Sequence, residues 1–245
     1  MNKKEGLDVS VVIPTYNEKE NISALIKKIE GVLKRDKKRF EIVIVDDNSP
    51  DGTADIAKAL NKRYRNIQVL TRKKKGGVGA AYYFGYKNSK GGIIIGMDAD
   101  LSHNPYEIPK LLRRLEEGYD MVLGSRHMHG AYYEHKKFNT FRKYLTSKYG
   151  NILTSVILGI KIHDFTNGFR CFRREILQDI NLINKGNSLL MEIIAKTYWN
   201  GHKIAEVPVT FMDRKKGTSK LRLLKEPIEF LGEVFQLKRQ RLKSF

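Results

Sequence analysis

The sequence predicts an α/β protein with a mixed, mainly parallel sheet flanked by helices and a C-terminal amphipathic helical appendage. Short apolar runs alternate with amphipathic stretches through the first 125 residues, which is typical of βαβ units. Each apolar run ends in a polar or glycine-rich cluster, and the carboxyl ends of parallel strands meet at one edge of a sheet. Helical spacing of apolar residues returns beyond residue 222.

The first half of the chain predicts five strands separated by helices. Apolar runs predict strands at Val9–Pro14, Glu41–Val45, Ile67–Leu70, Gly92–Met97 and Met121–Leu123. Apolar residues three and four positions apart predict helices at Asn21–Leu33, Asp51–Leu60, Gly79–Ser89 and Ile108–Glu116. Glycines 77 and 79 follow the third strand, and their spacing fits neither a dinucleotide fingerprint nor a P-loop. We expect them to allow close packing of the helix on the sheet.

The second half is less regular. We expect a loop over Met128–Lys137, an amphipathic stretch over Phe141–Ile160 and a helix over Ser188–Trp199. A strand over Ile204–Met212 contains Pro208, which favours the edge of a sheet. The sequence predicts one domain over residues 1–222, followed by an amphipathic helix over 223–245. The lysines and arginines of that helix suit a membrane surface.

Composition limits the class of protein. A hydrophobic content of 41% with 30% charged residues indicates a globular chain, and no apolar run reaches the roughly 18–20 residues of a membrane span. Cys171 is the only cysteine, which excludes an intrachain disulfide and makes a reducing cytoplasm the expected compartment. The net charge of +19 favours a polyanionic partner: nucleic acid, anionic lipid or a phosphorylated substrate.

Two carboxylates follow the strand at 92–97. Asp98 and Asp100 are separated by one residue and come directly after a buried-strand pattern. Such a pair suits a hard divalent cation that also holds a substrate diphosphate, because Mg²⁺ prefers oxygen ligands and keeps open positions. The alternative is an acidic turn without a ligand, and the pair alone does not decide between them.

The first two strands also end in polar clusters. Tyr16 and Glu18 fit either a turn before a helix or a flat face and an acceptor for a nucleoside. Of the adjacent aspartates that follow the second strand, we expect Asp47 to accept hydrogen bonds from a base or ribose and Asp46 to support it. Asp51 is expected to cap the next helix.

Seven motifs occur in a recognisable order. They are Pro-Thr-Tyr-Asn-Glu at 14–18, Asp-Asp-Asn-Ser-Pro-Asp-Gly-Thr at 46–53, Gly-Val-Gly-Ala at 77–80, Met-Asp-Ala-Asp-Leu-Ser-His at 97–103, Gly-Ser-Arg at 124–126, Asp-Phe-Thr-Asn-Gly-Phe-Arg at 164–170 and Phe-Met-Asp-Arg-Lys-Lys-Gly-Thr-Ser-Lys-Leu at 211–221. Together they resemble the dolichyl-phosphate mannose synthases, inverting glycosyltransferases with the Rossmann-like GT-A fold. The resemblance covers about residues 8–222.

The resemblance implies roles for individual residues. A nucleotide sugar would contact Pro14, Tyr16, Glu18, Val45, Asp47, Asp98, Ala99, Asp100, Arg126, Arg214 and Lys220. Asp98 and Asp100 would hold Mg²⁺ or Mn²⁺. The acceptor phosphate would meet Lys143, Ser147, Arg214 and Lys220, and the catalytic set would be Asp100, Arg126 and Arg214. Some relatives carry a glutamine ligand where this chain has Ser102, which leaves the third protein ligand open.

The implied reaction is transfer of mannose from GDP-mannose to a polyprenyl phosphate such as dolichyl phosphate. A lipid acceptor implies a peripheral protein on the cytoplasmic face of a membrane, held by its own basic surface or by a membrane-anchoring subunit. Glucosyl transfer from UDP-glucose and other GT-A transferases are alternatives. A basic nucleic-acid-binding module is disfavoured, and no nucleic acid partner is expected, because the carboxylates at the strand ends would repel a phosphate backbone in the absence of metal.

Overall fold

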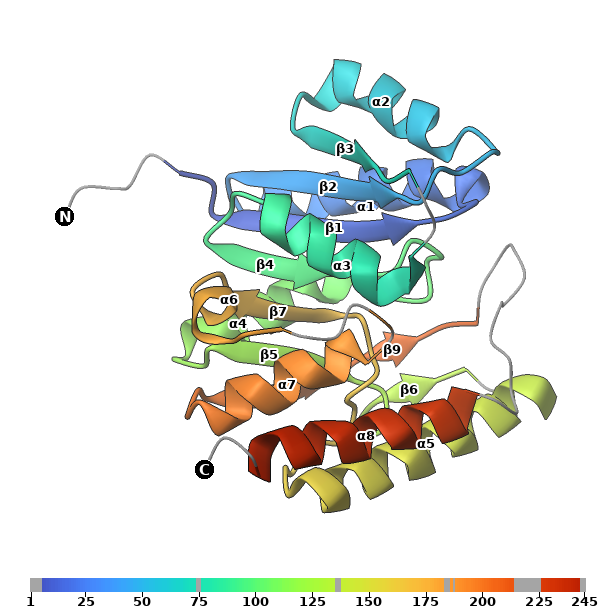
Figure 1. The fold of residues 1–245 in the computed structure, drawn as a ribbon. Coiled ribbons are helices and arrows are strands. Elements are labelled where there is room, and N and C mark those ends of the chain that lie inside the picture. The colour runs from blue at the N-terminus through green and yellow to red at the C-terminus, as the bar shows by residue number, and fades with distance from the viewer. Residues whose placement is uncertain are drawn as a thin grey trace.

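The computed structural model of the protein describes residues 6–73, 76–134, 138–182, 186, 188–213 and 226–242. Its centre is a seven-stranded sheet in the order β3-β2-β1-β4-β7-β5-β8 (Figure 1). The strands of this sheet are β1 (Val9–Thr15), β2 (Phe40–Asp46), β3 (Ile67–Thr71), β4 (Ile93–Gly96), β5 (Met121–Ser125), β7 (Arg170–Arg173) and β8 (Ile204–Pro208). A small second sheet pairs β6 (Tyr132–Tyr133) with β9 (Thr210–Phe211).

Helices cover both faces of the large sheet. They are α1 (Lys19–Arg35), α2 (Thr53–Tyr64), α3 (Gly77–Asn88), α4 (Ile108–Glu116), α5 (Phe138–Leu158), α6 (Ile176–Asp179), α7 (Leu189–Trp199) and α8 (Glu226–Leu242), with a short 3₁₀ turn at Pro105–Glu107. Successive side chains of a strand point to opposite faces, so Val11 packs with α1 and α4 whereas Val12 packs with α3 and α7. Burial on both faces explains why these strands read as nearly continuous apolar runs.

One strand runs against the others. β7 is antiparallel to both of its neighbours, β4 and β5, while the remaining pairs of the large sheet are parallel. Arg170 begins this strand and is fully buried. Its guanidinium donates to the carbonyl oxygens of Asn167 (3.1 Å) and Leu190 (2.6 Å), which ties the strand to α7. No strand was predicted here from the sequence.

The predicted fold class is confirmed, with differences in detail. All five strands expected in the first half are present, and β8 lies at the edge of the large sheet, as Pro208 predicted. The strand expected over Ile204–Met212 is divided into β8 and β9, and the loop expected over Met128–Lys137 contains β6.

The two glycines in the first turn of α3 differ from expectation. A Cβ on Gly79 would lie 1.6 Å from the carbonyl oxygen of Gly186, so Gly79 packs against the segment before α7 and not against the sheet. Gly85 is the glycine that packs on the sheet, against Val12 and Val45. Gly77 has a φ of 83°, a left-handed conformation that explains why a glycine begins the helix.

Two helices lie side by side at the β8 end of the molecule. α8 runs along α5, and both lie on the side of the sheet that α7 covers (Figure 1). Val234 and Leu237 of α8 and Leu158 of α5 are buried in the same core cluster as α7. Among the helices that the structure describes, none combines the length and the hydropathy required to cross a bilayer.

Candidate active site

The loops after β1 and β2 are joined by hydrogen bonds at the carboxyl ends of the strands. Thr15 Oγ1 donates to the Asp46 carboxylate (2.9 Å), which also accepts from the backbone nitrogen of Ser49 (2.8 Å). The backbone nitrogen of Glu18 donates to Thr53 Oγ1 at 3.0 Å. Asp46 therefore ties the two loops together, while its predicted support of Asp47 stays a prediction. The cap position of α2 is occupied by Gly52 and not by Asp51, whose carboxylate accepts from the backbone nitrogen of Thr53 at 3.0 Å.

These loops carry the residues expected to meet a nucleotide. Pro14 and Val45 are partners in the β1–β2 register, and Tyr16 and Glu18 are half-buried just beyond β1. Val45 is fully buried and packs in the core. The structure thus brings this group together at one edge of the sheet, while their contact with a nucleotide stays a prediction.

Asp47 is held by an arginine that sequence reasoning missed. Arg72 Nη2 donates to Asp47 Oδ2 at 2.7 Å and Nε donates to Oδ1, which makes a two-point ion pair that is largely buried. The backbone nitrogen of Gly76 also faces this carboxylate, at 3.4 Å. The signal was available in part, because Arg72 directly follows β3, the parallel neighbour of β2. A ligand at this position meets a neutralised pair and not an isolated carboxylate.

The carboxylates expected to bind metal lie in the loop after β4. Asp98 is 35% exposed, and its Oδ1 accepts a hydrogen bond from Tyr82 at 2.8 Å. Asp100 is buried, and its Oδ1 accepts from the backbone nitrogen (3.0 Å) and hydroxyl (2.6 Å) of Ser102. Ser102 therefore orients Asp100. Ala99, between the two carboxylates, is buried in the core.

The donor chemistry of this loop fits a hard divalent cation. Two carboxylates supply oxygen ligands, and the described residues contain no cluster of three or more His, Cys, Asp or Glu side chains suited to a metal. The remaining coordination positions would be filled by water and by substrate oxygens, which is the usual arrangement for Mg²⁺ at diphosphate sites. The tyrosine hydroxyl fixes the direction of the Asp98 carboxylate.

His103 links this loop to the loop before β7. The backbone nitrogen of Asp98 donates to His103 Nδ1 (3.2 Å), so the ring proton lies on Nε2, which donates to Asn167 Oδ1 (2.7 Å). Asn167 Nδ2 in turn donates to the Gly124 carbonyl at 2.6 Å. His103 is buried and stacks on Phe169. His163 is exposed, and its Nδ1 lies 2.7 Å from Glu206 Oε2.

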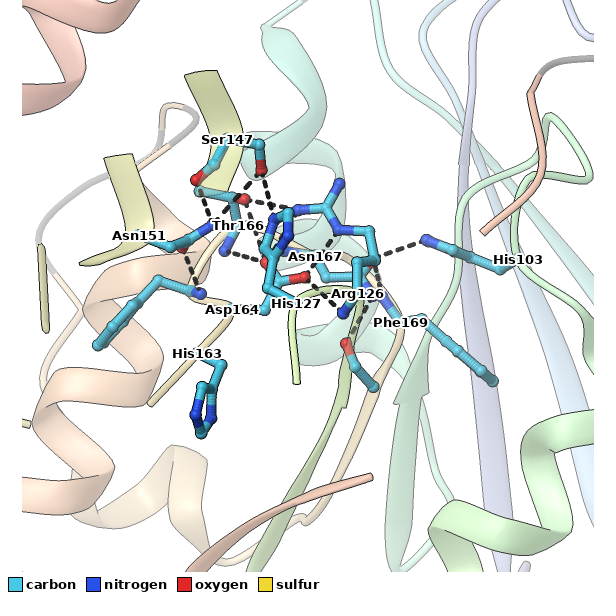
Figure 2. A network of polar contacts seen from close by, with 12 residues as sticks. His103, Arg126, His127, Ser147, Asn151, His163, Asp164, Thr166, Asn167 and Phe169 are labelled. Carbon is cyan, nitrogen blue, oxygen red and sulfur yellow. Dashed lines mark hydrogen bonds and ion pairs between the residues drawn. The ribbon is translucent and has the colours of Figure 1, made fainter. Parts of the chain in front are cut away.

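Arg126 and Asp164 form a buried pair at the centre of Figure 2. Arg126 Nε and Nη2 donate to the two carboxylate oxygens at 2.7 and 2.8 Å, and Nη2 also donates to Thr166 Oγ1 at 2.7 Å. Burial alone would raise the pKa of Asp164, but the Arg126 charge and its hydrogen bonds outweigh burial and lower the pKa to about 2. Arg126 is 11% exposed and lies over the Phe211 ring.

Two residues expected to meet the acceptor phosphate, Lys143 and Ser147, lie on α5. Ser147 Oγ is 2.9 Å from His127 Nε2, and His127 directly follows Arg126. Asn151 Nδ2 donates to the Ser147 carbonyl at 2.9 Å (Figure 2). Lys143 lies one helical turn before Ser147 and is half-buried. Arg214 and Lys220, assigned by resemblance to donor and acceptor phosphates, lie outside the described residues.

The sequence matches a known family and curated relatives. The model of the family described as "Glycosyl transferase family 2" matches residues 10–180. A dolichol-phosphate mannosyltransferase of Pyrococcus furiosus is 39% identical over 234 residues, which cover 94% of this chain but only 64% of that longer protein. A polyprenol monophosphomannose synthase of Mycolicibacterium smegmatis is 35% identical over 218 residues, covering 86% of this chain and 80% of the relative.

Solved structures share the fold. Glucosyl-3-phosphoglycerate synthase of Mycobacterium tuberculosis, in complex with Mn²⁺, UDP-glucose and phosphoglyceric acid, matches with a TM-score of 0.71 over 96% of this chain and 81% of that chain. The same enzyme with Mn²⁺, UDP and phosphoglyceric acid gives a TM-score of 0.70. At 18–19% identity these likenesses concern the arrangement of the backbone, which is of the GT-A type.

Proposed function

The chain belongs to glycosyl transferase family 2, and from that premise we propose that it transfers mannose from GDP-mannose to a polyprenyl phosphate such as dolichyl phosphate. Two relatives at 35–39% identity carry names of this activity. The observation that carries the proposal is that the site holds both a partly exposed carboxylate that suits a metal, Asp98, and the buried Arg126–Asp164 pair. Burial alone would lower the pKa of Arg126, but the charge of Asp164 and its hydrogen bond outweigh burial and raise the pKa, with a smaller contribution from Asp98.

The reaction needs stabilisation of negative charge more than it needs a base. A phosphate monoester has a second pKa of about 6, so the acceptor is largely dianionic at neutral pH and is itself a nucleophile. A divalent ion held by Asp98 and Asp100 would supply electrostatic stabilisation of the diphosphate that leaves. Mg²⁺ and Mn²⁺ both suit an all-oxygen donor set.

Arg126 is placed to act on the phosphates. Asp164 engages Nε and Nη2, and Nη1 has no hydrogen-bond partner within the part of the chain that the structure describes. The carboxylate thereby fixes the plane of the guanidinium without using all of its donors. Preorganised donors of this kind stabilise developing charge without reorganising during the reaction.

A membrane face would present the protein to its lipid acceptor. Four exposed apolar side chains of α5 follow helical spacing: Tyr149, Ile152, Leu153 and Val156. The neighbouring helix α8 adds two more, Phe235 and Leu242. Basic residues follow on α8, at Lys238, Arg239 and Arg241. An apolar stripe with basic flanks binds at the headgroup boundary of an anionic bilayer. We place the protein there as a peripheral enzyme of the cytoplasmic face, alone or with a membrane-anchoring subunit.

A radiolabelled transfer assay tests the proposal. The protein is given labelled GDP-mannose or UDP-glucose, with dolichyl phosphate in vesicles and either Mg²⁺ or Mn²⁺. We expect label in the organic phase from GDP-mannose alone, lost in Asp100→Asn and retained in the control Asp55→Asn, whose side chain is 82% exposed. Label in the organic phase from UDP-glucose alone would show that the donor is UDP-glucose and not GDP-mannose. No lipid product from either donor would overturn the assignment to polyprenyl phosphate.

A further inference from the structure

His127 occupies an aromatic enclosure beside the acceptor residues. Its ring stacks with Tyr133 at 6.2 Å and meets Tyr144 at 5.5 Å, between β6 and α5. The ring points Nε2 at Ser147 Oγ, 2.9 Å away (Figure 2). Nδ1 is buried and has no hydrogen-bond partner among the described residues. No role was predicted for this histidine from the sequence.

The surroundings select the tautomer. A buried N–H without an acceptor loses its hydration without compensation and is rare in folded proteins, whereas a bare acceptor nitrogen is tolerated more often. The proton therefore lies on Nε2, and His127 donates to Ser147 Oγ. Burial lowers the pKa of His127 to about 4, and the positive charges of Arg126 and Lys148 add to this while Asp164 opposes it. The imidazole is neutral at physiological pH.

This donation leaves the Ser147 hydroxyl hydrogen available. Serine and threonine inside helices commonly donate back to the carbonyl four residues earlier. Thr154 on the same helix does so, to the Gly150 carbonyl at 2.8 Å. Ser147 makes no such bond within the described structure; its oxygen accepts from His127 and faces Asn151 Nδ2 at 3.4 Å.

We propose that His127 is a positioning residue for the acceptor: its Nε2–H fixes the Ser147 hydroxyl so that the serine donates its hydrogen to the acceptor phosphate. The inference rests on the proposed function and on the role for Lys143 and Ser147, contact with the acceptor phosphate, that the family resemblance implies. His127 does not touch the substrate in this arrangement. Its effect passes through one hydroxyl and concerns the acceptor, not the nucleotide sugar.

Steady-state kinetics with each substrate varied separately test the proposal. His127→Phe keeps the ring but removes the donor, and we expect the KM for polyprenyl phosphate to rise about tenfold, within the range for a lost hydrogen bond to a charged group. The KM for GDP-mannose is expected to stay unchanged. His127→Gln places an amide nitrogen near the former Nε2 position and should restore most of the loss. His129→Phe, at an exposed position two residues further on, is the matched control.

A double variant separates positioning from a general structural effect. If His127 acts through Ser147, His127→Phe/Ser147→Ala should be no worse than Ser147→Ala alone. The inference would be overturned if the effects of the two substitutions multiplied in the double variant. Equal changes in the KM values for both substrates, or failure of His127→Gln to restore acceptor binding, would also overturn it. Thermal unfolding of every variant accompanies the kinetics. A wild type that transfers no label overturns the proposed function as well, whereas an active wild type with an unaffected His127→Phe overturns only the inference.

Discussion

Removing the charge of Asp164 should destabilise the fold far more than removing an exposed carboxylate. Asp164→Asn keeps the size of the side chain, but one carboxylate oxygen becomes an amide nitrogen. That nitrogen is a hydrogen-bond donor and faces an N–H donor of the Arg126 guanidinium. The carboxylate is fully buried and also accepts from the backbone nitrogens of Arg126 (3.0 Å) and Asn167 (3.2 Å). Breaking a buried pair on one side costs about 3–5 kcal/mol, because an uncompensated charge is left behind.

Urea unfolding at pH 7 measures this cost. For a chain of this size the same loss corresponds to a fall in Tm of roughly 10 °C. The control is Asp8→Asn, whose carboxylate is 39% exposed and pairs with Arg39 at 3.2 Å. An exposed pair of this kind contributes about 1 kcal/mol or less. If Asp164→Asn loses no more than the control, the Arg126–Asp164 pair does not hold the site together and the argument for its preorganising role is wrong.

Three further outcomes follow from the geometry. Tyr82→Phe removes the hydrogen bond to Asp98, so Mn²⁺ affinity, measured by electron paramagnetic resonance, should fall about tenfold; unchanged affinity would contradict a metal role for that carboxylate. Gly79→Ala forces a Cβ onto a backbone carbonyl and should cost about 1–3 kcal/mol of unfolding free energy, whereas Gly31→Ala, with open space in α1, should cost nothing. Because the folded pKa of His127 lies below its unfolded value, its contribution to stability is present above pH 6.5 and is lost as the pH falls towards 4. Wild type should therefore lose up to about 3 kcal/mol more than His127→Gln between pH 7 and 4 in urea titrations, and parallel curves would refute the shift.

The sequence predicts the first half of the fold well because burial leaves a local signature. Strands covered on both faces are continuous apolar runs, and α1 shows its buried face at regular spacing through residues such as Ile22, Leu25 and Ile29. β7 was not predicted because it is only four residues long and begins and ends with arginine. Arg170 is buried there only because three-dimensional structure supplies backbone carbonyls to its guanidinium.

For the site, too, local patterns were predicted and contacts between distant residues were not. Asp98 and Asp100 were recognisable because strand-end carboxylates are a local pattern. The partners that fix the other charged groups are distant in sequence: Arg72 lies 25 residues from Asp47, and Asp164 lies 38 residues from Arg126. Nothing in the residue types pairs them. The hydrogen bond from Ser102 to Asp100 was likewise not predicted, because it depends on the conformation of the loop after β4.

The antiparallel strand β7 has a consequence for how the chain reaches its native state during synthesis. β4 and β5 flank β7 and do not pair with each other, so neither gains its partner on that side until residues 170–173 have been made. A nascent chain that has completed β5 therefore leaves the β7-facing edges of β4 and β5 open over a further 45 or so residues of translation, and β5 also waits for β8. Because translation adds about 5–20 residues per second, this exposure lasts seconds, and truncation before Arg170 should yield an aggregating product.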